Sequence, residues 1–247
     1  MKKLHLSFLA IGAILSLGIL STGCLKSDNN NPDPEVAGLM AFNLVPDKSV
    51  TVAIGGNSIT NQPLAFNSYT GTYLRVYPGT RTVESFDYAT NGSLATVSDS
   101  FAVDKYYSVF VVGANGAYQN VLVNDNFDDL TGTAGKAYIR YINAVNGSAN
   151  SPVTITAGGS EVANDNAAFA SVSEFVAVPA GDVTITLNGS SGVNRTITTT
   201  ERNVYTVLLT SGATSTDPAQ IKYVTNGILD AEEGQRVSTS SRSAVIN

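Results

Sequence analysis

PVTITAGG at 152–159 repeats, in the second half of the chain, the stretch SVTVAIGG at 49–56. In both stretches aliphatic residues alternate with Thr or Ala, and the run ends at Gly-Gly. Alternation with a period of two predicts a strand with one apolar and one polar face, and the Gly-Gly pair predicts a hairpin turn. The duplication itself predicts two copies of one β-structured domain.

Four further pairs of segments occur in the same order along the chain. LMAFN at 39–43 matches IRYIN at 139–143, YLRVYPG at 73–79 matches EFVAVPAG at 174–181, YYSVFVV at 106–112 matches NVYTVLL at 203–209, and YQNVLVN at 118–124 matches QIKYVTN at 220–226. The second member follows the first by about 100 residues each time. We therefore expect two domains, at residues 36–130 and 136–230.

Each copy contains about seven strand-like segments separated by Gly-Gly, Asn-Gly or Pro-Gly signals, a spacing typical of β-sandwiches. Helix-period patterns and strand–helix alternation are absent from the sequence, which argues against a parallel α/β sheet. The predicted fold class is all-β, with two tandem immunoglobulin-like antiparallel β-sandwiches; a barrel is the alternative.

Four residues are expected to have structural roles within the copies. Tyr107 and Tyr205 lie just before the most apolar strand of each copy, where sandwich proteins often bond a tyrosine hydroxyl to a nearby loop. Gly79 and Gly181 end the turns that follow Pro78 and Pro179.

Each copy resembles the domain of unknown function 4397, a family found in secreted and lipid-anchored bacterial proteins. The resemblance is carried by AYIRYIN at 137–143, VTIT leading into Gly158-Gly159, VPAG at 178–181 and YTV at 205–207. The first copy matches less well, since it has Met40 where the second has Arg140. The family contributes no established catalytic residue.

The start of the chain is typical of a bacterial lipoprotein. Lys2 and Lys3 precede an apolar run from Leu6 to Leu20, and Cys24 follows Ser-Thr-Gly. The run is shorter than the roughly 20 residues that span a bilayer as a helix, so residues 1–23 are interpreted as a cleaved signal peptide and Cys24 as the acylated first residue. An ordinary secretory signal and a retained anchor remain alternatives, because Ser21 stands where lipoprotein signals usually have Leu; such looseness is common in lipoproteins of the Bacteroidetes type, which this start resembles.

Residues 24–35 are polar and contain two prolines, so they predict a flexible tether. Residues 231–247 show no period and predict a disordered tail. With the anchor, these segments place the expected protein at the outer membrane, attached by lipid and exposed to the cell surface.

Composition excludes several kinds of chemistry. The net charge is −6 and no basic run follows Lys3, so nucleic acid is not an expected partner. The one histidine, His5, leaves with the signal peptide, and Cys24 is the one cysteine. Serine–histidine and cysteine–histidine hydrolysis, histidine zinc sites and thiol chemistry are thereby excluded, and no cofactor is expected.

Acidic clusters are the remaining candidates for a reactive or metal site. Asp125, Asp128 and Asp129 lie in NDNFDDL, and Asp230, Glu232 and Glu233 lie at the matching place in the second copy. The favoured interpretation is a solvated linker; the alternatives are a calcium site and a pair of carboxylates for glycoside hydrolysis.

These observations lead to three functional hypotheses. The first is a non-enzymatic cell-envelope lipoprotein acting as an interaction or spacer module, with the membrane as partner through Cys24. The second is a carbohydrate-binding accessory lipoprotein of an outer-membrane glycan uptake system, in which tyrosines such as Tyr69, Tyr73 and Tyr77 would stack on sugars in place of the missing tryptophan. The third is a polysaccharide hydrolase.

Overall fold

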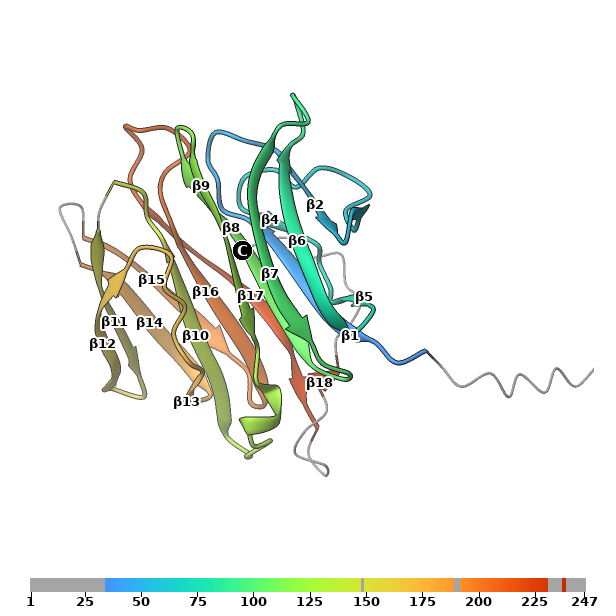
Figure 1. Cartoon of the computed structure of the whole chain (residues 1–247). Coiled ribbons are helices and arrows are strands. Elements are labelled where there is room, and N and C mark those ends of the chain that lie inside the picture. Colours follow the sequence, from blue (N-terminus) through green and yellow to red (C-terminus); the bar gives the residue numbers. More distant parts are fainter. Residues whose placement is uncertain (1–33, 148, 189–191, 231–236, 239–247) are drawn as a thin grey trace, which may run out of the picture. The chain divides into compact units, whose positions relative to one another are not determined.

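The computed structural model describes residues 34–147, 149–188, 192–230 and 237–238. The predicted signal peptide, Cys24, Glu232 and Glu233 lie outside these residues. Over the described ranges the chain forms strands and one short 3-10 helix, η1 (Phe127–Asp129), which lies between the two repeats (Figure 1).

Two strand-rich halves follow one another in the chain. The first contains β1 (Ala37–Asn43), β2 (Val50–Ile54), β3 (Asn57–Ser58), β4 (Ser68–Tyr69), β5 (Leu74–Val76), β6 (Gly79–Asp87), β7 (Ser93–Phe101), β8 (Tyr106–Ala114) and β9 (Ala117–Asn124). The second contains β10 (Lys136–Ala144), β11 (Asn150–Ala157), β12 (Ser160–Ala168), β13 (Val176–Pro179), β14 (Gly181–Leu187), β15 (Val193–Thr199), β16 (Asn203–Thr210), β17 (Gln220–Leu229) and β18 (Val237–Ser238).

Each half makes two sheets, and the two halves use the same strand order. In repeat 1 the sheets are β4-β1-β8-β9, with β5 also on β1, and β3-β2-β6-β7. In repeat 2 they are β13-β10-β16-β17-β18 and β12-β11-β14-β15. The predicted all-β fold with two tandem sandwiches is confirmed, and so is the internal repeat. The immunoglobulin sandwich groups its strands as ABED and CFG, whereas here the first strand of each repeat joins the last two.

One strand pair in each repeat runs parallel, a departure from the antiparallel expectation. β1 is parallel to β8, and β10 is parallel to β16. All seven residues of β1 are buried, as are eight of nine in β10. Strands buried on both faces are apolar almost throughout, which is why LMAFN and YYSVFVV lack the alternation of VTIT.

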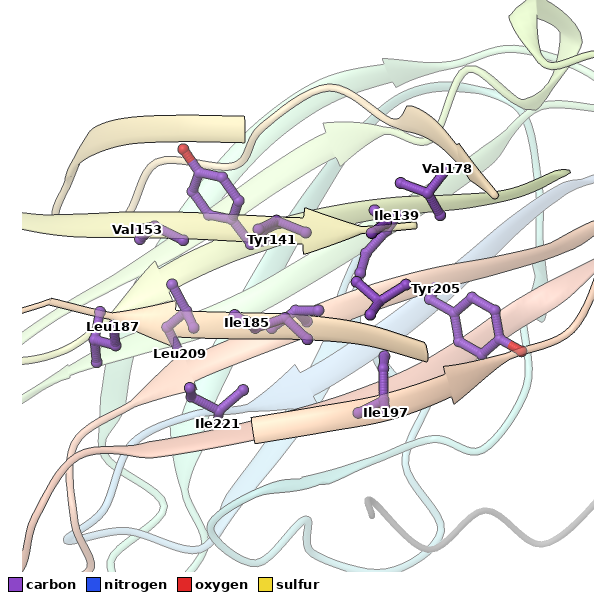
Figure 2. Packing of buried hydrophobic residues seen from close by; sticks show 14 of the residues in the cluster. Ile139, Tyr141, Val153, Val178, Ile185, Leu187, Ile197, Tyr205, Leu209 and Ile221 are labelled. Carbon is purple, nitrogen blue, oxygen red and sulfur yellow. The ribbon is translucent and has the colours of Figure 1, made fainter. Parts of the chain in front are cut away.

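The alternating strands form the core of each sandwich. In repeat 2, Val153 and Ile155 of β11 and Val183, Ile185 and Leu187 of β14 are buried against the inner side of β10 and β16 (Figure 2). The threonines between them lie on the outer, partly exposed face. Repeat 1 has the equivalent core around Val50, Val52, Val83, Val109 and Val111. Burial of each such side chain contributes about 1.5–3 kcal/mol to the free energy of folding, and this is the main driving force for each sandwich.

The Gly-Gly turns match the sequence expectation. Gly55 and Gly56 have φ of 55° and 80°, and Gly158 and Gly159 have φ of 56° and 78°. Positive φ at both central positions is the type I′ pattern that suits a two-residue hairpin. These glycines join β2 to β3 and β11 to β12.

A third core joins the two repeats. Even-numbered side chains of β1, β8, β10 and β16 point away from their own sandwich and pack together with side chains from η1 and β17. This inter-repeat core comprises Met40, Phe42, Leu44, Tyr73, Phe110, Val112, Phe127, Leu130, Tyr138, Ile142, Ala144, Val204, Leu208, Val224 and Leu229. The two repeats are therefore packed against each other through the central strands of one sheet from each.

The predicted disordered tail is corrected at one point. Val237 and Ser238 pair with Leu229 and Ile228 at the end of β17. The reason is that β17 is an edge strand there, with free backbone groups available for pairing.

Candidate functional site

The predicted acidic cluster is not brought together by the fold. Asp125 is fully buried in the inter-repeat core, whereas Asp128 pairs with Lys105 near the surface. In the described part of the chain no three His, Cys, Asp or Glu side chains are grouped as a metal would require. The solvated-linker interpretation does not fit Asp125, because its side chain is buried and paired with a cation. The sequence did not reveal that cationic partner.

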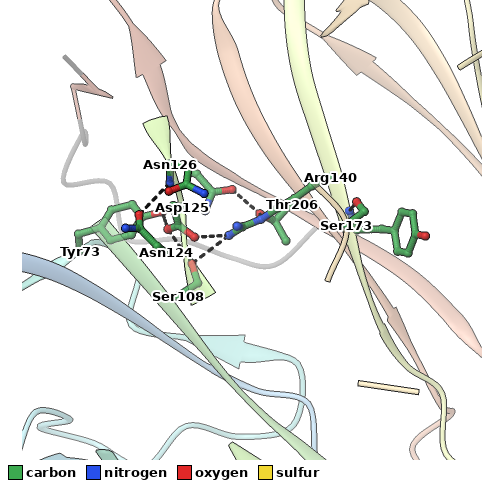
Figure 3. A network of polar contacts seen from close by, with 10 residues as sticks. Tyr73, Ser108, Asn124, Asp125, Asn126, Arg140, Ser173 and Thr206 are labelled. Carbon is green, nitrogen blue, oxygen red and sulfur yellow. Dashed lines mark hydrogen bonds and ion pairs between the residues drawn. The ribbon is translucent and has the colours of Figure 1, made fainter. Parts of the chain in front are cut away.

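That partner is Arg140, and the two belong to a closed ring of hydrogen bonds that crosses the repeat boundary (Figure 3). Arg140 Nη2 donates to Asp125 Oδ1 at 2.6 Å, and its Nε donates to Thr206 Oγ1 at 3.0 Å. Thr206 donates to Asn226 Oδ1 at 2.6 Å, and Asn226 Nδ2 donates to the Tyr73 hydroxyl at 2.9 Å. Tyr73 donates to Asp125 Oδ2 at 2.5 Å, which closes the ring.

Burial and two additional contacts reinforce this ring. Burial, with the Asp125 carboxylate beside it, raises the pKa of the Tyr73 hydroxyl well above its usual value, so Tyr73 remains a proton donor. Ser108 also donates to Asp125 Oδ2, at 2.9 Å, and the Arg140 guanidinium lies 4.4 Å from the centre of the Phe175 ring. The ring members bond one another across the repeat boundary, so they hold the two repeats together.

The ring is built from positions that correspond between the repeats. Strand register pairs Val76 with Ala37 and Val178 with Ala137, and it places Tyr107 and Tyr205 at the same point of β8 and β16. The equivalent pairs are therefore Met40 and Arg140, Tyr73 and Phe175, Ser108 and Thr206, and Asp125 and Asn226. For β9 and β17 the register corrects the sequence match of 118–124 with 220–226 by one residue. The cation comes from repeat 2 and the anion from repeat 1, so the charges favour pairing between unlike repeats.

The four residues predicted to be structural lie in turns and strand ends. The Tyr107 hydroxyl donates to Ser100 O at 3.1 Å and accepts from Ala102 N at 3.0 Å, and the Tyr205 hydroxyl accepts from Thr200 N at 3.0 Å. Gly79 and Gly181 have φ of 99° and 125° at the starts of β6 and β14. These contacts are those that the predicted tyrosine role requires.

A cleft lies at one end of the repeats, where loops of both meet. Its volume is about 830 Å³, within the range of small-molecule sites. Repeat 1 contributes the β1–β2 loop and the β8–β9 turn, and repeat 2 contributes the β10–β11 and β16–β17 loops. The lining residues are Pro46, Asp47, Ala114, Asn115, Val145, Asn146, Gly147 and 211–219.

Hydrogen bonds hold the loops of this cleft together. Asn146 N donates to Ser211 Oγ at 2.7 Å, which ties the two loops of repeat 2. Thr214 N donates to Asp217 Oδ2 at 2.9 Å within the β16–β17 loop. Gly212 is required there, since a Cβ at this residue would lie 2.3 Å from Asp217 Cβ. In repeat 1, the Tyr118 hydroxyl donates to Asp47 Oδ2 at 2.8 Å.

A smaller hollow of about 400 Å³ adjoins the cleft and shares Ala114, Asn115, Asn146 and Gly147 with it. Asn146 thus lies between the two. Its Nδ2 is buried and has no hydrogen-bond partner among the described residues. Buried amide groups normally have hydrogen-bond partners, so this donor is an unusual feature of the cleft wall.

The tyrosines considered for sugar stacking do not line the cleft. Tyr73 is in the buried ring, and Tyr69 stacks on Phe42 with ring centres 5.3 Å apart. Tyr77 is 66% exposed but lies near Gly79, at the opposite end of β6 from Asp87. No sequence motif indicates the cleft, because its loops differ in length and composition between the copies.

Comparison with known families matches the description "Domain of unknown function (DUF4397)" twice, at residues 37–146 and 137–235. The chain belongs to this family. The DUF4397 repeats cover almost all of the described residues and overlap at β10, the strand that opens repeat 2. Comparison with curated proteins finds no relative.

Solved structures similar to this DUF4397 chain come from Bacteroides and are described as candidate cell adhesion proteins. One from Bacteroides uniformis is 9% identical, with 78% of this chain and 97% of that one covered and a TM-score of 0.23. One from Bacteroides ovatus is 9% identical, with 78% and 98% covered and a TM-score of 0.22. Scores this low carry no argument about the present chain. No helix in the described ranges has the length and apolarity needed to cross a membrane.

Proposed function

We propose that this DUF4397 protein is a non-enzymatic interaction protein of the bacterial cell envelope, anchored by lipid on Cys24, whose two repeats act as one body. The observation that carries the proposal is the cleft of about 830 Å³ that neither repeat forms alone. A mere spacer needs no such concavity, and its repeats need not share a core.

The side chains of the cleft favour binding over catalysis. The cleft contains no imidazole, thiol or amine among its lining residues. Asp47 and Asp217 are the two carboxylates there, and both are exposed to water. A glycosidase instead keeps its general acid protonated in an apolar pocket. Release of new reducing ends from a polysaccharide by the purified protein would contradict this part of the proposal.

The anchor is tested by Cys24→Ala. Two or three acyl chains hold a protein stably to a bilayer, so we expect the unchanged chain in the membrane fraction and the variant outside it. Mass spectrometry of the N-terminal peptide is the second measurement. An unmodified Cys24 thiol in membrane-bound protein would rule out lipid anchoring.

The interaction role is tested at the cleft with two matched substitutions. Ala213→Trp fills the cleft, and Ala89→Trp places the same side chain on the β6–β7 turn, outside the cleft lining. Both are made in the Cys24→Ala chain, which carries no lipid. We expect this labelled chain to bind envelope preparations, Ala213→Trp to reduce binding at least tenfold, and Ala89→Trp to leave it unchanged. Equal binding by both variants would leave the spacer role as the better account.

A further inference from the structure

We infer that the loop-end cleft binds a neutral oligosaccharide, an inference that rests on the proposed interaction function and names its ligand class. Three features of the cleft point to this class: its hydrogen-bonding side chains, its charge and its lack of large apolar side chains. Each feature independently excludes other classes of ligand.

Short polar side chains dominate the lining. Hydroxyls come from the β16–β17 loop, amides from the β8–β9 turn and β10–β11 loop, and carboxylates from both repeats: Ser211, Thr214, Ser215, Thr216, Asn115, Asn146, Asp47 and Asp217. Carboxylates only accept hydrogen bonds, amides donate and accept, and hydroxyls do either. Sugar hydroxyls, which also donate and accept, match this mixture over several adjacent positions.

The charge of the cleft argues against anionic ligands. Its lining holds two carboxylates and no Lys, Arg or His. Lys48, beside Asp47 in the sequence, is engaged with Asp87 at 3.0 Å. An acidic polysaccharide or a phosphate would meet like charge without a compensating cation, so an anionic ligand is disfavoured.

The apolar part of the lining argues against a protein ligand. It consists of small residues, namely Pro46, Ala114, Val145, Ala213, Pro218 and Ala219. Peptide recognition relies on deep pockets for large side chains or on pairing with a free strand edge. This lining of loops provides neither, whereas small apolar surfaces suit the C–H faces of sugar rings.

Asn146 supplies the contact that a ligand would complete. Its backbone N–H is fixed to Ser211 Oγ, while its side-chain Nδ2 has no partner among the described residues. Asn146 lines both the cleft and the adjoining hollow, so a sugar hydroxyl oxygen bound there can accept from this donor. A donor without a partner in the free protein gains a full hydrogen bond on binding.

The test uses the Cys24→Ala chain, which carries no lipid, and envelope preparations pretreated in two ways. Periodate cleaves vicinal diols of sugars, and protease removes protein ligands. We expect periodate to abolish the binding that Ala213→Trp also abolishes, and protease to leave it intact. Because no aromatic residue lines the cleft to stack on a sugar, each site is weak, and an array of immobilised glucan, mannan and xylan fragments supplies the avidity to identify the sugar.

Variants separate this inference from the proposed function. Asn146→Ala should lower binding at least fivefold without lowering the unfolding midpoint, and Ala89→Trp should bind normally. Binding that is sensitive to Ala213→Trp but removed by protease, or an array response to acidic glycans alone, would overturn the neutral-sugar inference while the interaction role stands. Binding unaffected by Ala213→Trp would overturn both.

Discussion

At the scale of single residues, Arg140 and Asp125 show how duplication and divergence produced a specific contact. The equivalent residues Met40 and Asn226 are uncharged, so the ion pair exists once. Both side chains are almost completely buried, at 3% and 0% exposure. Removing one partner leaves an unpaired buried charge, and the free-energy cost of that charge exceeds the net stabilisation that the ion pair provided.

Arg140→Met, which introduces the residue found at the equivalent position of repeat 1, should therefore lower the free energy of unfolding by about 3–5 kcal/mol. Adding Asp125→Asn, the residue at its own equivalent position, removes the orphaned charge and should restore part of the loss. Urea unfolding of the single and double variants measures both values. A double variant less stable than Arg140→Met would contradict this account of the ring.

The pair Lys48–Asp87 makes stability depend on pH at both ends of the range. The pKa of Asp87 is lowered mainly by the hydrogen bond from Lys48 and next by that from Ala89 N. The same hydrogen bond to Asp87 raises the pKa of Lys48. The Asp87 contribution is present above its unfolded pKa and is lost as the pH falls through the lower folded value. The Lys48 contribution is present below its unfolded pKa and is lost as the pH rises through the higher folded value.

We therefore expect the stability difference between the unchanged chain and Asp87→Asn to be constant near neutral pH and to shrink toward zero below about pH 4, the unfolded range of aspartate. Urea midpoints measured from pH 7 to pH 2.5 test this. A difference that persists at the acidic end would mean that the carboxylate charge is not the stabilising feature.

The hydroxyl groups of Tyr107 and Tyr205 can be tested as a matched pair. Tyr107→Phe and Tyr205→Phe remove only the hydroxyls that bond residues 100, 102 and 200. Each should cost about 1 kcal/mol of unfolding free energy, with no change in envelope binding. A variant that loses binding but not stability would indicate a ligand role instead.

At the scale of elements, the β8–β9 hairpin depends on a glycine that is not in its turn. Gly113 has φ of 115°, and a Cβ there would lie 2.0 Å from Ala117 O. Gly116, in the turn, has φ of 90° but open space around it. Gly113→Ala should therefore destabilise by several times the roughly 1 kcal/mol expected for Gly116→Ala; equal thermal shifts of the two variants would contradict this.

The same scale shows what periodicity could and could not predict. Alternation placed the threonines of β11 and β14 outward and their aliphatic residues inward, as observed. Strands β1 and β8 gave a continuous apolar pattern, which fits burial on both faces but does not say what covers the second face. Parallel pairing and the position of Arg140 opposite Asp125 depend on contacts between segments far apart in sequence, so no local pattern could predict them.

At the scale of the whole molecule, the inter-repeat core makes the two duplicated domains parts of one packed structure. The sequence predicted two domains, each with its own core, and both cores are present. The third core exists because strands β1, β8, β10 and β16 are apolar on both faces of their sheets. Packing of these sheets also brings the loops of both repeats to one cleft. Loop geometry of this kind follows from how the repeats pack, which explains why the cleft could not be predicted from motifs.

A shared core implies that the repeats unfold together. Val83 belongs to the core of repeat 1 and Ile185 to that of repeat 2, and both are fully buried. Ile185→Ala should cost about 2–5 kcal/mol, and Val83→Ala somewhat less. If the repeats form one cooperative unit, each variant shifts one common urea transition, seen by hydrogen exchange in peptides of both repeats. Two separate transitions, with Ile185→Ala moving only that of repeat 2, would mean that the inter-repeat core is too weak to couple them, and the cleft would then open without unfolding either sandwich.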